Sequence, residues 1–527
     1  MATPVRKPGK NGRDKVMNCS RNRIADPKMG GMPDALLARL SGHVAAHMGL
    51  YFPRAKWQAL EKAFSSAAGE LGFKTPEECA NWFITTPISK ELVESMAGCL
   101  TIGETYFFRE NRSFEILAEE IIPEIILKRR GGEQRLRIWS AGSSTGEEPY
   151  SMAILLHRMN NVLKEWNISI LATDINPKAL RKAVEGVYTE WSFRNPPSWL
   201  KENYFRKSVD GLLKLISPIK KMVNFSYLNL VEDCYPSLSS DTNAMDVIFC
   251  RNVLMYFTPE LAGKVVERFH RSLVDGGWLV VSPCEASQVS YPQFKAVSFP
   301  GAVFYQKQAP GIELRGNKNP EPKVRFTTPL IPLFQPLPSK PTSAPLKPLP
   351  AILPPVPLEQ TDFKEALALY NKGLYPEAET MLAPLLPPNH ENVKANVLLC
   401  RIRANQGKLA EALTLLEQAI TADKLNPGLH YLRAMILQEQ GSDNEASISL
   451  KRALYLDRNL VIAHVALANL ALRLGKHKEY RKYLENALSI LGGYQPDEIL
   501  PESEGMTAGR LMKIIGAMDV MGGRNES

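Results

Sequence analysis

The sequence has few cysteines and no CxxC pair. Its seven cysteines are scattered over 527 residues, which argues against a disulfide framework and against a zinc knuckle. It also has no apolar run near the ~18 residues that a membrane-spanning helix needs, and no apolar N-terminal segment like that of a signal peptide. We therefore expect a cytoplasmic protein that is not inserted in a membrane.

Candidate metal ligands are equally sparse. His43 and His47 stand one helical turn apart, but no third ligand follows them closely in the sequence. We interpret them as two helix-surface histidines and expect no metal site.

The net charge of +9 is concentrated at the N-terminus, where residues 1–30 contain eight basic and two acidic residues. A basic arm of this kind can bind nucleic acid or an anionic surface. A tail without fixed structure explains the same composition. We favour the tail, and we expect no nucleic-acid partner.

From residue 33 to about residue 100 the pattern is helical. In residues 54–71 apolar side chains recur at spacings of three and four, which predicts a helix with one apolar stripe. A second helix is predicted to begin after Thr75 as N-cap, with Pro76 at its first position. These features predict a small helical domain.

From about residue 135 the sequence alternates short apolar runs with helical segments. The runs LRIWSA, ISILATDI, MDVIFCRN and GGWLVVSP have the composition of buried parallel strands. Their alternation with helices predicts a doubly wound α/β sheet. Residues 204–230 hold shorter alternating runs around Asp210-Gly211, which predicts a small antiparallel excursion beside the sheet.

The C-terminal third contains a spacer and then a repeat. Residues 310–357 hold 14 of the 39 prolines, a composition typical of a semi-extended linker. Beyond it, small residues keep one register around four glycines spaced 34 residues apart, which resembles the tetratricopeptide repeat. Such an array is a binding surface, so we expect a peptide or protein partner in its groove. The four glycines are Gly373, Gly407, Gly441 and Gly475.

These patterns divide the chain into six expected segments. They are a disordered basic tail (1–32), an N-terminal helical domain (33–105), an α/β domain (106–308), a proline-rich linker (309–360), the repeats (361–493) and a C-terminal tail (494–527).

The run IWSAGSSTGEEPYS (138–151) predicts a strand, a glycine turn and a helix. A nucleoside triphosphate needs a lysine in such a turn, and this turn has none. A dinucleotide places its pyrophosphate on the helix N-terminus, where Glu147 and Glu148 would repel it. S-adenosylmethionine has no phosphate and carries an ammonium that a carboxylate can bind. Asp174, at the end of the next strand, is well placed for ribose hydroxyls.

Five segments together resemble a known family in order and spacing. LTIGETYFFRE (100–110), WSAGSSTGEEPYS (139–151), ATDIN (172–176), NFSYLNL (224–230) and FCRNVLMYF (249–257) resemble the chemotaxis-receptor glutamate methyltransferases of the CheR type. The resemblance covers about residues 33–308, and the appended repeats resemble a subgroup with a C-terminal repeat domain. It implies a small all-α domain, a class I methyltransferase-like α/β domain with an antiparallel subdomain at about 187–228, and an α-helical repeat solenoid.

The resemblance also implies a cofactor, a substrate and a set of site residues. The cofactor is S-adenosylmethionine, and the substrate is the cytoplasmic domain of a methyl-accepting chemoreceptor. Arg109 and Tyr256 are the implied catalytic residues, with Tyr256 facing the transferred methyl group. The implied cofactor-binding residues are Thr105, Arg109 and Glu147 at the methionine end, Ala141 in the turn, Asp174 at the ribose, Asn229 and Leu230 at the adenine, and Asn252 and Val253 near the sulfonium.

Two other interpretations stay open at this point. A methyltransferase acting on nucleic acid is supported only by the basic tail, because the Asn-Pro-Pro of RNPPSW (194–199) does not follow the fourth strand as it does in adenine methyltransferases. A scaffold that binds the cofactor without transferring its methyl group belongs to a different class. The presence of Arg109, Glu147, Asp174 and Tyr256 argues against it.

Overall fold

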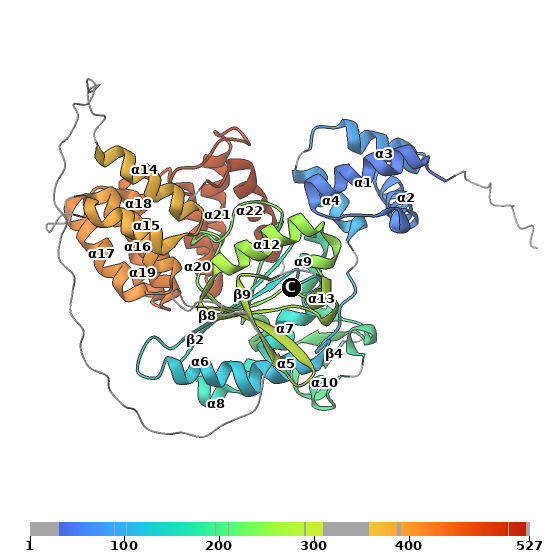
Figure 1. Cartoon of the computed structure of the whole chain (residues 1–527), viewed down its shortest axis with the longest axis horizontal. Coiled ribbons are helices and arrows are strands. Elements are labelled where there is room, and N and C mark those ends of the chain that lie inside the picture. Colours follow the sequence, from blue (N-terminus) through green and yellow to red (C-terminus); the bar gives the residue numbers. More distant parts are fainter. Residues whose placement is uncertain are drawn as a thin grey trace, which may run out of the picture.

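The computed structural model describes residues 31–88, 90–101, 103–194, 196–208, 210–288, 291–308, 358–386, 392–503 and 505–522. The predicted basic tail and proline-rich linker fall almost entirely outside these residues. Two helical modules flank a central sheet domain, with the N-terminal module on one side and the repeats on the other (Figure 1). Among the described residues, no helix has the length and apolar character needed to cross a membrane.

The N-terminal module is built from four helices around one apolar cluster. The predicted stripe of the second helix is confirmed, because Leu60, Phe64 and Ala67 are buried there. The predicted N-cap is confirmed as well, since the Thr75 hydroxyl accepts a hydrogen bond from the amide of Glu78. The helices are α1 (Asp34–Met48), α2 (Trp57–Leu71, preceded by the 3-10 turn Arg54–Lys56), α3 (Pro76–Thr85) and α4 (Lys90–Leu100).

The central domain contains a seven-stranded sheet in the order β6-β2-β1-β7-β8-β10-β9. The first five strands are parallel, while β10 and β9 are antiparallel. The four predicted apolar runs form β1, β2, β7 and β8, so the prediction of a doubly wound sheet is confirmed. The strands are β1 (Arg135–Ala141), β2 (Asn167–Asp174), β6 (Val223–Tyr227), β7 (Met245–Phe249), β8 (Leu273–Val280), β9 (Phe294–Phe299) and β10 (Ala302–Lys307).

Helices cover both faces of this sheet. Alternate strand residues point to opposite faces, so Ile138 and Val247 join the cluster containing α7 residues, whereas Trp139 and Ile248 join the cluster containing α12 residues. The helices are α5 (Asn111–Ile116), a π-helical turn (Leu117–Ile121), α6 (Ile122–Lys128), α7 (Glu147–Arg158), α8 (Asn160–Leu163), α9 (Pro177–Glu185), a 3-10 turn (Leu254–Tyr256), α12 (Pro259–Ser272) and α13 (Pro283–Gln288).

A separate three-stranded antiparallel sheet stands beside the main one, in the order β3-β5-β4. It confirms the predicted excursion, but only for residues up to Leu215. The prediction that residues 204–230 form one antiparallel unit is wrong for β6, which pairs in parallel with β2 at the edge of the main sheet. The elements are β3 (Val187–Tyr188), a 3-10 turn (Glu190–Phe193), α10 (Trp199–Tyr204), β4 (Phe205–Lys207), β5 (Leu213–Leu215) and α11 (Ser217–Lys220).

The C-terminal module consists of four helix pairs and a final helix. The four spaced glycines lie between the two helices of each pair, and all have positive φ, from 71° to 79°, which an L-residue adopts at a cost. This confirms the predicted repeats. The pairs are α14/α15 (Leu358–Asn371, Tyr375–Leu382, followed by the 3-10 turn Ala383–Leu385), α16/α17 (Val393–Asn405, Leu409–Ala422), α18/α19 (Pro427–Glu439, Asp443–Leu456) and α20/α21 (Val461–Arg473, His477–Leu491). Helix α22 (Ala508–Gly522) follows.

One buried carboxylate joins the repeats to the sheet domain through several hydrogen bonds. Glu439, at the end of α18, accepts hydrogen bonds from Arg135 Nη1 at 3.1 Å and from Asn243 Nδ2 at 2.8 Å. Arg137 Nη1 lies 3.7 Å from the same carboxylate, and Asn167 donates to the Glu439 carbonyl. Because these partners stand at or near the starts of β1, β2 and β7, the array docks at the edge of the sheet where the parallel strands begin.

Candidate active site

The candidate site lies at the opposite edge, where the parallel strands end. Asp174 ends β2, the glycine turn follows β1, Asn229 follows β6 and Asn252 follows β7. These strands are neighbours in the order β6-β2-β1-β7, and the chain leaves β1 toward β2 before returning to β7. In open parallel sheets, a ligand binds outside the carboxyl ends of the strands at such a reversal point. The fold therefore brings four of the predicted segments to one edge.

The turn after β1 places backbone close to its neighbours. Gly142 has φ +84°, and a Cβ there would lie 2.4 Å from Val253 Cγ2, so only glycine fits without rearrangement. The Ser144 amide donates to one Asp174 oxygen and the Asn176 amide to the other, both at 2.8 Å. Burial raises the pKa of Asp174, while these amides act in the opposite direction. Asp174 is thus held in place, and each of its oxygens keeps a lone pair for a hydroxyl donor.

Glu147 begins α7 and is 2% exposed. Its oxygens accept hydrogen bonds from the hydroxyls of Thr145 at 2.6 Å and Ser192 at 2.8 Å. Burial raises the pKa of Glu147, while its hydrogen bonds and the charge of Lys182 act in the opposite direction. Among the described residues no cation lies within ion-pair distance of it, and a buried carboxylate without a paired cation suits a cationic ligand.

Two further polar groups in the turn are unsatisfied. The hydroxyls of Ser143 and Ser144 are buried and have no hydrogen-bond partner in the described structure. Buried polar groups are normally paired, so unpaired ones at a glycine turn indicate a place for a polar ligand. Together with Glu147 and Asp174, they fit a molecule that carries both an ammonium and hydroxyl groups, as S-adenosylmethionine does.

The segment carrying Arg109 has an unusual backbone. Phe108 and Glu110, on either side of Arg109, both have positive φ, 56° and 53°, a conformation uncommon outside glycine. The Phe108 amide donates to the Ser151 hydroxyl at 2.9 Å, which ties this segment to α7. Arg109 Nη1 donates to the Glu104 carbonyl at 2.7 Å, and Thr105 is the adjoining residue.

Tyr256 lies where the N-terminal module meets this edge. Burial raises the pKa of the Tyr256 hydroxyl, and the positive charge of Arg109 acts in the opposite direction. The Tyr256 carbonyl accepts a hydrogen bond from the Tyr51 amide at 2.7 Å. Lys56 Nζ lies 5.6 Å from the centre of the Tyr256 ring. The N-terminal module therefore forms one wall beside Tyr256.

Of the two predicted adenine residues, Asn229 contacts the N-terminal module and Leu230 is held within the sheet domain. Asn229 Nδ2 donates to the His47 carbonyl at 3.2 Å, and the Leu230 carbonyl accepts from Arg268 and Tyr235, both at 2.9 Å. A cavity of about 280 Å³ opens here, lined by residues of α1, the α3–α4 connection, α4 and the end of β6. Its lining residues are Ala46, His47, Ile88, Val93, Tyr227, Asn229, Val231 and Glu232.

Two important residues of the site escaped the sequence analysis. Glu285 of α13 is 0% exposed, and its two oxygens accept hydrogen bonds from the amides of Asn252 at 2.8 Å and Val253 at 2.7 Å. Arg251, also buried, pairs with Glu148 at 2.7 Å. Glu285 holds the turn after β7 in its shape, including Asn252 with φ +59°. A single glutamate more than 30 residues downstream carries no local signal of this contact.

His43 and His47 lie with ring centres 4.7 Å apart. Burial and the neighbouring ring of His47 lower the pKa of His43. In the part of the chain that the structure describes, no cluster of three or more metal-binding side chains occurs.

Comparison with known proteins gives matches for both halves of the chain. Residues 103–301 match the family described as CheR methyltransferase, SAM binding domain, and residues 427–460 match the tetratricopeptide repeat. The match of residues 103–301 identifies S-adenosylmethionine as the cofactor. The solved structure of MamA 41-end from Desulfovibrio magneticus RS-1 aligns over 25% of this chain and 75% of its own length, at 20% identity and a TM-score of 0.24.

Two curated relatives match less than half of this chain but most of their own length. The chemotaxis protein methyltransferase of Borreliella burgdorferi is 33% identical over 251 residues, which are 47% of this chain and 87% of the relative. Chemotaxis protein methyltransferase 2 of Vibrio cholerae is 35% identical over 223 residues, 42% of this chain and 76% of the relative. With the strand order and the cofactor edge described above, these matches show that the chain belongs to the chemotaxis protein methyltransferase family of the CheR type, extended by tetratricopeptide repeats.

Proposed function

We propose that this methyltransferase transfers a methyl group from S-adenosylmethionine to glutamate side chains in the cytoplasmic domain of a methyl-accepting chemoreceptor. The observation that carries the proposal is the placement of the carboxylates of Glu147 and Asp174 at the carboxyl ends of the parallel strands, in a chain of the chemotaxis protein methyltransferase family. An acceptor glutamate has a pKa of about 4.3 and is already an anion near neutral pH, so the reaction requires no general base. A cation and a phenol can position such a carboxylate.

The cofactor supplies a methyl group that a positively charged sulfur has already activated. In this proposal Glu147 binds its ammonium, Arg109 and Thr105 its carboxylate, and Asp174 its ribose hydroxyls. The Tyr256 hydroxyl fixes the attacking oxygen of the acceptor. Catalysis then arises from positioning and electrostatic complementarity. The remaining proposed contacts are Ala141 in the turn, Asn229 and Leu230 at the adenine, and Asn252 and Val253 near the sulfonium.

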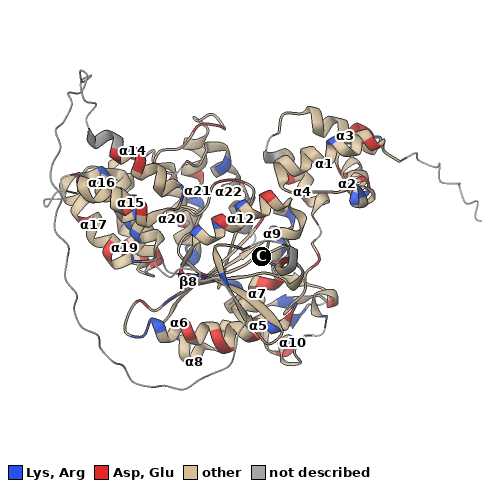
Figure 2. Cartoon of the chain, viewed as in Figure 1, with Lys and Arg blue, Asp and Glu red and all other residues tan. Residues whose placement is uncertain are grey.

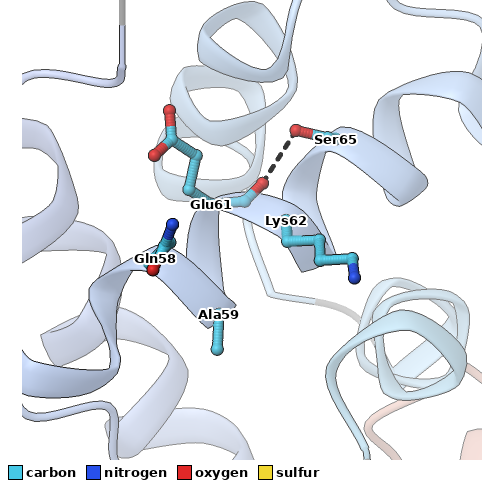
Figure 3. A pocket seen from close by; sticks show the side chains of 5 residues that line it. All are labelled: Gln58, Ala59, Glu61, Lys62 and Ser65. Carbon is cyan, nitrogen blue, oxygen red and sulfur yellow. Dashed lines mark hydrogen bonds between the residues drawn. The ribbon is translucent and has the colours of Figure 1, made fainter.

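The face of α2 is the proposed contact for the receptor. Lys56 precedes this helix and stands over the Tyr256 ring, so a protein lying along α2 reaches the reacting centre. A hollow of about 560 Å³ on α2 is lined by Gln58, Ala59, Glu61, Lys62 and Ser65 (Figure 3). Ser65 donates to the Glu61 carbonyl there, and Lys62 extends away from that pair. The exposed cations at this end of the molecule, which are Arg54, Lys56 and Lys62, suit an acidic receptor surface. Figure 2 shows Lys and Arg in blue at α2.

Two other elements belong to the same proposal. The repeats bind a protein or peptide partner, and the enzyme works in the cytoplasm, where the six free cysteines among the described residues would stay reduced.

The direct test uses purified full-length protein, methyl-labelled S-adenosylmethionine and membranes that contain the host's chemoreceptors. Label on a receptor band that mild base releases as methanol is the expected result, because carboxyl methyl esters are base-labile. Base-stable label, or label on RNA or DNA, would assign another acceptor. Cofactor binding without any transfer would favour the scaffold interpretation.

A further inference from the structure

The first helices of the third and fourth repeats, α18 and α20, are buried over most of their surface. In α20 all residues from Val461 to Ala468 are buried, more than two helical turns. The second helices differ, since α21 buries only the single stripe Tyr480, Leu484, Ala487 and Leu491. One face of α20 packs on the second helices of the array. Its other face must be covered by something outside the repeats.

That cover is supplied by the residues after the last repeat. Residues 495–503 and 505–508 form the two arms of a narrow hairpin, in which the Leu500 amide donates to the Met506 carbonyl at 2.9 Å and Ile499 bridges Thr507. Leu500 and Met506 are buried in the same apolar cluster as the α18 and α20 residues. The chain's own C-terminal segment therefore occupies the face of the array formed by its first helices.

The tip of this hairpin reaches the second and third repeats. Glu502 Oε2 lies 3.5 Å from Arg401 Nη2 of α16. A Cβ at Gly428, the second residue of α18, would lie 2.4 Å from the Glu502 carboxyl carbon, so the carboxylate sits directly on the helix backbone. The tip of the hairpin thus lies on the first helices α16 and α18.

We infer that this face of the array is a binding site for an extended acidic segment of a partner protein, and that residues 495–508 are its built-in occupant. The segment QPDEILPESEGMTA has four carboxylates and no basic residue, with an Ile-Leu-Pro run beside them. A partner with the same chemistry has to displace it, placing an aliphatic side chain where Leu500 lies and a carboxylate on Arg401. This inference rests on the proposed partner-binding role of the repeats and not on methyl transfer.

The segment that begins with this hairpin also connects the repeats with the end of the sheet at which the candidate site lies. Helix α22, which continues the hairpin, packs against α9 and against β6, and so covers the edge strand of the main sheet. Burial raises the pKa of the Cys234 thiol and of the Tyr227 hydroxyl, and the charge of Arg510 in α22 acts in the opposite direction on both. Tyr227 lines the cavity that also contains Asn229. Displacement of residues 495–522 therefore removes a support of the cavity next to the proposed adenine site.

The test measures binding of a fluorescent peptide with the sequence of residues 495–508 to the full chain by anisotropy. The variant Leu500→Asp/Glu502→Lys loosens the built-in hairpin and leaves the sequence of the repeats unchanged. We expect the peptide to bind this variant at least tenfold more tightly than the wild-type chain. A control peptide carrying Glu502→Lys should bind the variant at least tenfold more weakly than the native peptide does.

A second variant tests whether a folding defect, and not opening of the hairpin, explains tighter binding of the peptide. In Arg401→Glu/Glu502→Lys the ion pair is reversed, so the hairpin should stay closed and the native peptide should bind no better than to wild type. Equal binding of the native peptide to the wild-type chain and the Leu500→Asp/Glu502→Lys variant would overturn the inference, as would absence of binding to both. Because the readout is binding, it is independent of whether any acceptor is methylated.

Discussion

Arg135 and Glu439 form an ion pair at 3.1 Å, although 304 residues separate them in the sequence. Each side chain is 5% exposed. One belongs to the first strand of the catalytic sheet and the other to the third repeat, so the pair is a buried junction between the two modules. Such a junction stabilises an assembly only while both charges are present, because an unpaired buried charge is costly.

Glu439→Gln should therefore loosen the repeats from the sheet domain. The amide keeps the size of the side chain but leaves Arg135 and Arg137 without this counter-charge, at an expected cost of about 3 kcal/mol. Calorimetry should show the repeats unfolding at a lower temperature than the sheet domain. Glu417→Gln is the matched control, because Glu417 is 51% exposed in its pair with Arg433. Identical transitions for the two variants would argue against a structural role for the junction.

Tyr256→Phe should slow methyl transfer about tenfold to a hundredfold while leaving cofactor affinity nearly unchanged. The ring packing stays, and only the hydroxyl proposed to fix the acceptor oxygen is lost. Turnover with receptor membranes and calorimetric titration with S-adenosylmethionine give the two quantities. Tyr51→Phe serves as the control, since Tyr51 is 43% exposed and contacts Tyr256 through its backbone. A collapse of cofactor affinity in Tyr256→Phe would contradict this role.

Glu147→Gln should weaken binding of S-adenosylmethionine at least about tenfold, the effect of losing one charge-assisted contact. Because burial raises the pKa of Glu147, the wild-type carboxylate becomes neutral at a higher pH than an ordinary glutamate. Affinity should therefore fall as the pH decreases through that raised pKa. Titrations from neutral pH down to the ordinary glutamate pKa of about 4.3 should show this slope in wild type and in the exposed control Glu190→Gln. The same slope in Glu147→Gln would assign it to another group.

Glu285→Gln should disturb the turn after β7. The new amide NH₂ group faces backbone N–H donors in place of an acceptor, which costs about 2 kcal/mol for the unsatisfied group. We expect a lower melting temperature and a higher KM for the cofactor, since Asn252 and Val253 lose their anchor. Glu267→Gln on the exposed face of α12 is the control. A variant with unchanged KM would show that the turn keeps its shape without this carboxylate.

Features that depend on residues close together in the sequence could be predicted. Thr75 with Pro76 is a local helix-start signal, and the 34-residue spacing of Gly373 and its successors marks the inter-helix turns directly. The parallel strands β1, β2, β7 and β8 are apolar runs that few other structures explain. The convergence of Glu147 and Asp174 on one edge follows from parallel pairing alone.

The features that were missed depend on distant partners. The sequence of β6 resembles that of the antiparallel strands β4 and β5, and only its pairing with β2 places it in the main sheet. The junction of Glu439 and the anchoring by Glu285 join residues far apart in the sequence, so neither leaves a local pattern. One signal was present in the sequence: α20 is almost entirely apolar over residues 461–468, and a helix of that kind requires cover on more than one face.

The two ends of the parallel strands face different parts of the protein. The repeats lie where the strands begin, and the candidate site lies where they end. Strand β1 runs from Arg135, beside the repeats, to Ala141, beside the glycine turn, a span of about 20 Å for seven extended residues. A protein held by the docked array stays within a few nanometres of the reacting centre on a rigid support. Tethering at such a distance corresponds to an effective concentration of the order of millimolar. The enzyme can therefore act on an acceptor that it binds only weakly, provided that the acceptor belongs to the same assembly as the array's partner.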